Sequence, residues 1–496
     1  MELINEIPNL DLSASFNLKD RDNMTSFSNY KKQVPKKFYI FRIVLVASVG
    51  GFLFGYDGSV ITGALPFLTE YFHLSATGQG VAVSSAALGA IVGPLGSLKF
   101  AERIGRRKTM IVAVICFSVS AIGNALSITI WDFAFWRFVT GIGVGLAMIS
   151  SPIYIAELSP PKIRGQMVNM NQLSNVLGIL LAVIASYFFS FSGWGWRWMF
   201  GSEVIPSVLL AVGLIFIPES PIWLSVHGRF KEALYILTKI NGVSQAQNEL
   251  HAIKTEIVKE RDTSAELLQP GFKRALIVAI ILMIFSQING VNMMLTYAPT
   301  ILADAGIKMG TNAILSSIPI FLFIFVCTII AFYLIKHFSR RGLLITSVLF
   351  MAVGHVIMAI NLQEHWPPLY TLIPMSIGAG AFTLGLAPLS WVIVSEIFPN
   401  SARGKGLAIV CFFLYLSSFI TSLAFPILTH WFNSRFNNTS GVYWIFFCIC
   451  IGCLIFSYKM IPETKGFTLD QIGEFWRAHS SGIRKNREGI PLVKRF

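Results

Sequence analysis

The segment ELSPPKIRG at Glu157–Gly165 recurs in altered form as EIFPNSARG at Glu396–Gly404. In both copies a glutamate precedes an arginine by seven residues, and the copies lie 239 residues apart (396 − 157). Two further features repeat at nearly the same distance. They are Arg106-Arg107 with Arg340-Arg341 (340 − 106 = 234) and Pro218-Glu219 with Pro462-Glu463 (462 − 218 = 244). Three features at nearly one period predict that the chain is a parallel duplication of a single structural unit.

The composition excludes a water-soluble domain. Of the 496 residues, 54% are hydrophobic and 13% are charged, whereas soluble domains have about 25% charged residues. The net charge of +14 could indicate a nucleic-acid-binding protein. The basic residues, however, gather in short loops between apolar runs, where they set the orientation of membrane proteins. The composition therefore predicts a polytopic membrane protein that binds no nucleic acid.

Twelve apolar runs are long enough to cross a bilayer, which takes about 20 residues each. They lie at about 39–65, 78–100, 109–130, 132–156, 166–190, 198–217, 274–303, 311–335, 342–360, 369–395, 405–430 and 441–461. The pattern predicts an all-α integral membrane protein with two bundles of six transmembrane helices and a substrate site near the midplane between them. The predicted domains are an N-terminal tail at 1–38, a first bundle at 39–218, a helical linker at 219–273, a second bundle at 274–461 and a C-terminal tail at 462–496.

Lysine and arginine are distributed unevenly among the loops. The loops after runs 2, 4, 8 and 10 are basic, with Arg103, Arg106, Arg107, Lys108, Lys162, Arg164, Lys336, Arg340, Arg341, Arg403 and Lys405. The alternate loops hold only Arg197, Lys308 and Arg435. Because cytoplasmic loops carry the excess of basic residues, both termini and the linker are predicted to be cytoplasmic.

Ionisable side chains inside spans are costly, about 3 kcal/mol on insertion scales, and so need a partner or a function. Asp57 lies 15 residues past Arg42 (57 − 42) in run 1, and Arg137 lies 20 residues before Glu157 (157 − 137) in run 4. At 1.5 Å per residue, these separations place both about 22–30 Å from the cytoplasmic side. The acid and the base can therefore pair, and protonation of the acid can break the pair. A static structural ion pair is the alternative. Glu203 in run 6 is a third candidate, either buried or at a helix start.

Run 7 carries a polar stripe with steps of three, three and four residues, which form one helical face. Its members are Ser286, Asn289, Asn292 and Thr296, and Gln287 borders it. Such hydrogen-bonding side chains suit a neutral hydroxylated ligand, although they can also join helices. Gln172 and Asn175 form a similar step in run 5, and Trp391 in run 10 could stack on a sugar ring.

Other polar features indicate packing rather than chemistry. The glycines of Gly141–Gly145 lie inside a span with no preceding strand, so they predict close helix contact and not a dinucleotide loop. The six cysteines lie in apolar runs and are expected to pack rather than to bind metal. His355, the one histidine deep in a span, is interpreted as packed in preference to a proton relay. No nucleophile and base are paired in a way that suggests an enzyme.

Several motifs resemble the sugar porter family of the major facilitator superfamily across nearly all of residues 40–470. The matching segments are Gly51–Asp57, Glu102–Arg107, Arg137–Gly145, Pro152–Gly165, Pro218–Leu224, Trp391–Glu396 and Pro462–Gly466. The resemblance implies a proton-coupling group of Asp57, Arg137 and Glu203. It implies sugar-facing positions at Phe54, Gln172, Gln287, Asn292 and Trp391, with Asn175 and Asn289 as replacements for amides lost elsewhere. It also implies a cytoplasmic charge network that holds the outward-open state, made of Arg107, Glu157, Arg164, Glu219, Glu396, Arg403 and Glu463.

The chain departs from the family pattern at positions that usually carry polar groups. Ser286-Gln287 stands where two glutamines are usual, and Thr296-Tyr297 stands where two tyrosines are usual. Apolar residues occupy three further sites, Ile179, Ile324 and Leu414, and Lys336 and Ser339 replace the acid and glycine of the second charged loop. Each lost hydrogen bond costs about 1 kcal/mol. The substrate could therefore be a polyol such as a cyclitol, and the second latch could be weaker.

These patterns predict a proton-coupled symporter of a monosaccharide or polyol. We expect a monomer without cofactor in a plasma membrane, as in the bacterial inner membrane, that uses the proton gradient as its energy source. Its partners are a small neutral hydroxylated substrate, a proton and the lipid bilayer. Two alternatives stay open: a facilitative sugar or cyclitol (for example inositol) uniporter, and a non-transporting nutrient receptor.

Overall fold

The computed structural model describes residues 37–160, 163–191, 195–259, 270–398, 400–467, 471, 472 and 476. Most of the two predicted tails lies outside this part of the chain. The described residues form helices joined by turns and short loops. Twelve of these helical segments are long and apolar enough to cross a membrane, which confirms the predicted number of spans.

The first half contains six spans. Its helices are α2 (Lys37–Phe72), α3 (Ala76–Ile104), α4 (Arg106–Leu126), α5 (Ile130–Glu157), α6 (Arg164–Phe189), α7 (Gly195–Gly201) and α8 (Val204–Ile215). The linker follows with α9 (Pro221–Val226), α10 (Phe230–Asn241) and α11 (Val243–Lys259). The sixth span is divided, because α7 and α8 are separate helices that together cover Gly195–Ile215.

The second half repeats this plan. Its elements are α12 (Pro270–Ile288), α13 (Val291–Thr296), α14 (Ala298–Asp304), α15 (Thr311–His337), α16 (Arg340–Gln363), η5 (Pro368–Thr371), α17 (Leu372–Leu384), α18 (Leu386–Ile397), α19 (Asn400–Phe436) and α20 (Ser440–Met460). Two spans are interrupted: α12 and α13 form the seventh, and η5, α17 and α18 form the tenth.

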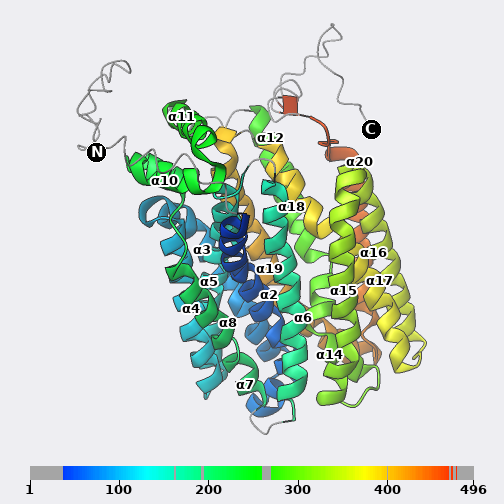
Figure 1. Ribbon diagram of the computed structural model, residues 1–496. Helices are drawn as coiled ribbons and strands as arrows, with labels where there is room; N and C mark the ends of the chain where they lie inside the picture. Colours follow the sequence, from blue (N-terminus) through cyan, green and yellow to red (C-terminus); the bar gives the residue numbers. More distant parts are fainter. Residues whose placement is uncertain are drawn as a thin grey trace, which may run out of the picture.

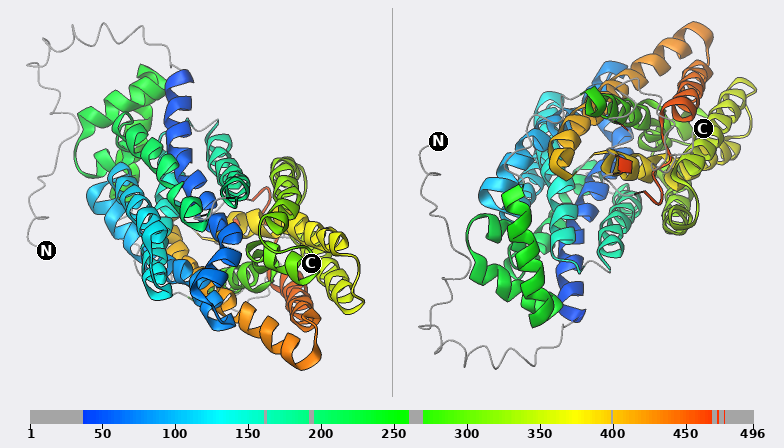
Figure 2. Two further views of the ribbon diagram at one scale, coloured as in Figure 1. Left: turned by 90° about the horizontal axis from the view of Figure 1, so that it is seen from below. Right: turned by 90° about the horizontal axis from the view of Figure 1, so that it is seen from above.

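The two halves stand side by side, and the linker helices α10 and α11 cover one end of the first half (Figure 1). We call this the linker end and the opposite one the far end. Across the boundary between the halves, α3 packs on α19 and α6 packs on α15. These are the second and eleventh spans and the fifth and eighth. Views along the helix axes show the two groups of helices meeting along this boundary (Figure 2).

Local sequence explains where several helices start. Ser75, Thr129, Ser220 and Ser339 each accept a hydrogen bond from a backbone N–H two or three residues into the following helix. These hydroxyls satisfy donors that have no partner within the helix. These local hydrogen bonds therefore mark the starts of α3, α5, α9 and α16.

The glycine run of α5 allows the backbone of α3 to approach. A Cβ atom at Gly141 would lie 2.0 Å from the carbonyl oxygen of Ala86, and one at Gly145 would lie 2.7 Å from the Cα of Gly93. Any larger residue at these positions would force the two helices apart. The structure thus confirms that this run serves close helix contact.

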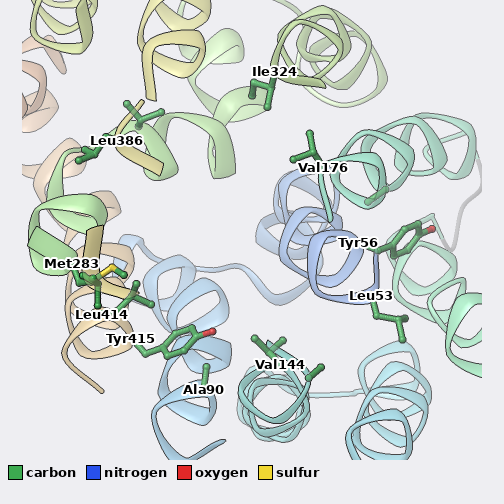
Figure 3. Packing of buried hydrophobic residues seen from close by; sticks show 14 of the residues in the cluster. Leu53, Tyr56, Ala90, Val144, Val176, Met283, Ile324, Leu386, Leu414 and Tyr415 are labelled. Carbon is green, nitrogen blue, oxygen red and sulfur yellow. The ribbon is translucent and has the colours of Figure 1, made fainter. Parts of the chain in front are cut away.

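Large apolar side chains lie on the outside of the spans as well as inside. Leu209 of α8 is 65% exposed, Ile329 of α15 is 50% exposed and Phe350 of α16 is 58% exposed. Meanwhile Leu53, Val144 and Met283 lie in the interior (Figure 3). Apolar residues on both faces are typical of helices in lipid. The fold is therefore that of an integral membrane protein.

Candidate functional site

Asp57 and Arg137 form an ion pair inside the first half. The guanidinium Nη1 of Arg137 donates to Oδ1 of Asp57, and each side chain is 2% exposed. Asp57 lies within α2 and Arg137 within α5, so two spans contribute one partner each. The match in depth predicted from the sequence is therefore a contact in the structure.

Glu203 completes this buried group. It lies between α7 and α8, directly before the first residue of α8, and its side chain is fully buried. It interacts electrostatically with both Asp57 and Arg137. Both possibilities left open for Glu203 thus apply, because it is at a helix start and it is buried. Among the described residues Asp57 contacts the guanidinium, while both carboxyl oxygens of Glu203 have no hydrogen-bond partner. Full ionisation of the two carboxyl groups would therefore leave one uncompensated negative charge in the interior.

The surroundings of Arg137 favour a group that can change its partner. Its guanidinium carbon lies 5.6 Å from the ring centroid of Phe200. Among the described residues, its Nε atom has no hydrogen-bond partner. An aromatic face stabilises a cation without fixing its direction. Arg137 can therefore remain buried while its carboxylate partners exchange a proton.

The seventh span is broken between Asn289 and Val291, where Gly290 has φ +87°. One amide side chain lies on each side of the break. The Nδ2 of Asn292 donates to Oε1 of Gln287 at 3.1 Å, and both residues are partly exposed. A pair of amides joined to each other and partly accessible can exchange this bond for bonds to a ligand's hydroxyl groups.

Asn289 has other partners than the sequence suggested. Its Nδ2 donates to the carbonyls of Phe285 (3.0 Å) and Ser286 (2.7 Å), and its Oδ1 accepts from the N–H of Val291 at 3.0 Å. The side chain is 1% exposed. Its hydrogen-bonding capacity is thus used by backbone groups that the helix break frees. In this structure the side chain of Asn289 supports the break, and its role as a ligand contact stays a prediction.

The two amide side chains of the fifth span differ in their accessibility. Asn175 is buried, and its Nδ2 donates to the carbonyl of Gly51 at 3.4 Å, which joins α6 to α2. Gln172, one turn earlier in the same helix, is exposed. Of the two, Gln172 has the side chain that is accessible to a substrate.

At two positions where the family usually has a polar residue, this chain has a buried apolar one. Ile324 of α15 and Leu414 of α19 are each 4% exposed, and Figure 3 shows Ile324 near Val176 of α6, in the opposite half. Phe54 and Trp391, both predicted to face a sugar, are partly exposed. The interior between the halves therefore offers aromatic and aliphatic surface with few amides.

A cluster of charges joins the loops of the first half at the linker end. Arg106 donates from Nε (3.3 Å) and Nη2 (3.1 Å) to Oε1 of Glu157. The hydroxyl of Ser220 donates to the other oxygen of Glu157. Glu219 accepts from the backbone N–H of Arg107 at 3.0 Å. These bonds connect α4, α5 and the start of α9.

The second half has the same arrangement. Arg340 donates to Glu396 at 3.5 Å, and Thr464 donates to Glu396 at 2.5 Å. Glu463 accepts from the backbone N–H groups of Arg340 (3.1 Å) and Arg341 (3.2 Å). Each acid of the first cluster thus has a counterpart in the second. The repeated motifs therefore form equivalent structures in the two halves.

Two arginines of the predicted network have different partners. Arg107 donates from its side chain to the carbonyls of Leu214 (2.7 Å) and Ile215 (3.2 Å), so its neighbour Arg106 is the ion-pair partner of Glu157. Arg164 lies 3.9 Å from Glu249 of the linker helix α11. The side chain of Arg403 lies outside the described residues. Arg107 thus belongs to the cluster through its backbone N–H, which bonds Glu219, while its side chain caps the end of α8.

Glu249 is the acid that the sequence did not single out. Burial raises its pKa, and the hydrogen bond from Asn241 and the charge of Arg164 offset this only in part. Its contact with Arg164 ties the linker to the start of α6. No pattern in the sequence marks it, because the linker carries several acids at similar spacing.

Side-chain hydrogen bonds join the two halves of the described chain at Ser190 and at Tyr415. The hydroxyl of Ser190, after α6, donates to Thr311 at the start of α15 at 2.9 Å, at the far end. Tyr415 of α19 donates to the sulfur of Met148 of α5. Each ion pair between described residues joins groups within the first half and its linker or within the second half. The charge pairs formed by the described residues therefore brace each half and do not bridge the two.

The duplicated bundles, the buried acid–base group in one and the broken polar helix in the other define a membrane transporter. The sequence profile of the sugar (and other) transporter family matches residues 43–476. The chain therefore belongs to this family.

Curated relatives and solved structures agree with this assignment. The D-xylose-proton symporter of Escherichia coli is 35% identical over 473 residues, with 88% of this chain and 96% of the relative covered. The major myo-inositol transporter of Bacillus subtilis is 32% identical, with 93% and 99% covered. The inward-open structure of the xylose transporter from E. coli matches with a TM-score of 0.78 at 33% identity, covering 88% of this chain and 100% of the other. The fold is that of the major facilitator superfamily.

Proposed function

We propose that the protein is a proton-coupled symporter of a monosaccharide or polyol that works by alternating access. The observation that carries this proposal is the buried group of Asp57, Arg137 and Glu203. A transporter without coupling has no need of two carboxyl groups around one guanidinium in its interior, where each charge is costly. The D-xylose-proton and arabinose-proton symporters among its relatives support the same assignment.

The proposed coupling follows from charge balance. With Asp57 ionised, its attraction to Arg137 holds α2 against α5. When a proton neutralises Asp57, the attraction is lost, and Glu203 can take over as the counter-ion of the guanidinium. With Glu203 ionised, uptake of the proton by Asp57 takes the net charge of the group from −1 to 0, so the proton-loaded group is neutral. Because α2 also contacts α13 and α14 of the second half, release of α2 can alter the contact between the halves.

The substrate class follows from the groups near the helix break. Gln287 and Asn292 supply donors and acceptors for hydroxyl groups, and Phe54 and Trp391 supply aromatic surface for the faces of a ring. The apolar residues Ile324 and Leu414 leave fewer hydrogen bonds than a fully polar site would. A cyclitol such as myo-inositol is a second candidate beside a pentose or hexose, and the inositol transporter of B. subtilis is among the relatives.

The proposed location is a plasma membrane, such as the bacterial inner membrane, with the linker end in the cytoplasm. The basic loops that contain Arg106 and Arg340 lie at the linker end together with the linker helices, and cytoplasmic loops carry such residues. The relatives cited above are bacterial proteins. We propose that a monomer suffices, since each element of the site comes from one chain, and that no cofactor takes part.

The experiment is uptake of radiolabelled D-xylose, and separately of myo-inositol, into proteoliposomes with an inward proton gradient. Accumulation should collapse when a protonophore is added. Asp57→Asn should lose accumulation but keep exchange of solute across equal concentrations. Normal accumulation by Asp57→Asn would refute the mechanism, and exchange without any proton-driven accumulation by the wild type would identify a uniporter. Absence of any flux would leave a nutrient receptor.

A further inference from the structure

The break in the seventh span is supported by a residue from another helix. His355 of α16 is fully buried, and its Nε2 lies 2.8 Å from the backbone carbonyl oxygen of Asn289. A carbonyl can only accept, so Nε2 carries the hydrogen and donates it. The Asn289 carbonyl is a group that the helix break deprives of its usual partner, because the chain turns at Gly290. His355 replaces that lost partner.

The space around this bond is closely packed. The ring of His355 lies 5.6 Å from the ring of Phe446 and 6.3 Å from that of Tyr443 (centroid distances). A Cβ atom at Gly290 would lie 2.3 Å from the ring of Phe446. The other nitrogen of His355, Nδ1, has no partner among the described residues. The histidine thus makes one hydrogen bond, and it makes it to the break.

Asn289 supports the same break from within the seventh span. Its side chain bonds the carbonyls of Phe285 and Ser286 and the N–H of Val291. The backbone carbonyl of Asn289 and its side chain therefore fix both sides of the break at once. Gln287 lies two residues before Asn289, and Asn292 lies three residues after it. The distance between these two amides depends on the angle at the break.

We propose that His355, through its bond to the Asn289 carbonyl, is a positioning residue that sets the spacing of the Gln287 and Asn292 amides and so the specificity of the substrate site. The part about substrate rests on the function proposed above. The part about the break does not, because it can be measured without any ligand. Loss of the donor leaves a buried carbonyl unpaired, which favours movement at the break.

The experiment compares three variants of the full-length protein in detergent or nanodiscs. His355→Leu removes the donor, and His355→Gln can place an amide N–H near the position of Nε2. Val348→Ala is the matched control, since it lies two turns away on α16 and is equally buried. Hydrogen exchange of the segment 287–297 should become about tenfold faster in His355→Leu, equal to about 1.4 kcal/mol. It should stay near the wild-type rate in His355→Gln and Val348→Ala.

Binding of D-xylose and of myo-inositol is measured on the same samples. Whichever probe binds the wild type should bind His355→Leu about tenfold more weakly, and His355→Gln should restore its affinity. Unchanged exchange in His355→Leu would overturn the proposal. Faster exchange with unchanged affinity would overturn its specificity part. If the wild type binds neither probe, the proposed substrate class is wrong, while the exchange rates still decide whether His355 holds the break.

A second variant keeps the proposal testable if His355→Leu does not fold. Asn289→Leu removes the three side-chain hydrogen bonds of the break and leaves the carbonyl bond to His355 in place. It should also accelerate exchange in 287–297. Where His355→Leu does fold, its effect and that of Asn289→Leu should combine non-additively, because both residues act on one structural element. Independent, additive effects on exchange would contradict a shared role.

Discussion

Removal of the Asp57 charge should destabilise the protein by an amount that depends on Glu203. In Asp57→Asn, Arg137 keeps a guanidinium that is 2% exposed but loses its ion-pair partner. Breaking a buried pair in this way costs about 3–5 kcal/mol. Since the Glu203 carboxyl interacts with Arg137 as well and can supply the missing charge, we expect the low end, about 3 kcal/mol.

The double variant separates these contributions. Glu203→Gln alone should change the free energy of unfolding little, because Asp57 still balances Arg137. Asp57→Asn with Glu203→Gln leaves no counter-charge, so its cost should exceed the sum of the single effects by about 2 kcal/mol, a typical coupling within one buried network. The assay is denaturant unfolding of the purified protein, followed by tryptophan fluorescence. An additive double variant, or an Asp57→Asn protein as stable as the wild type, would refute the reasoning.

Three further predictions concern other parts of the molecule. Arg106→Gln should reduce the free energy of unfolding by about 2 kcal/mol, as for hydrogen bonds to charged groups. Arg340→Gln should reduce it less, because the Arg340–Glu396 contact is longer than the Arg106–Glu157 contact (3.5 Å against 3.1 Å). Equal reductions in unfolding experiments would contradict this reasoning from the distances. Ile324→Asn should bind a pyranose about fivefold more tightly, one hydrogen bond being worth about 1 kcal/mol; weaker binding in calorimetry would show that this position does not face the ligand. Glu249→Gln should remove a loss of stability with rising pH: since burial raises the folded pKa of this acid above 4.5, stability from Glu249 is present below pH 4.5 and declines as pH rises through the folded pKa. A pH profile of thermal unfolding identical to that of the wild type would argue against it.

The number and order of the spans could be predicted because lipid imposes a simple rule on length and polarity. The predicted run at 132–156 corresponds to the span Ile130–Glu157, and the run at 342–360 to Arg340–Gln363. The first span is an exception, since its helix extends to Phe72 beyond the predicted end at 65. Polar residues near its end, such as Glu70, are compatible with a helix that projects from the membrane, and hydropathy alone does not register them.

The pairing of Asp57 with Arg137 was also accessible, because depth in a membrane follows from residue counts along straight helices. The direction in which a side chain points around the helix axis could not be predicted in this way. Arg106 and Arg107 have the same depth and charge, and only the turn at Gly105 decides which of them faces Glu157. The role of Asn289 was missed for a related reason. The prediction of a polar stripe with constant spacing assumes a continuous helix. The helix in fact breaks at Gly290, and the side chain of Asn289 forms hydrogen bonds with backbone groups beside the break.

The most direct test of the coupling mechanism measures proton movement together with the substrate. Proteoliposomes without an imposed gradient are mixed with D-xylose or myo-inositol in weakly buffered medium, and the external pH is recorded. Wild-type protein should make the medium alkaline as substrate enters, and Asp57→Asn should exchange the substrate with no change of pH. Substrate entry through the wild type at constant pH, or alkalinisation that persists in Asp57→Asn, would contradict a coupling role for the buried Asp57–Arg137 pair.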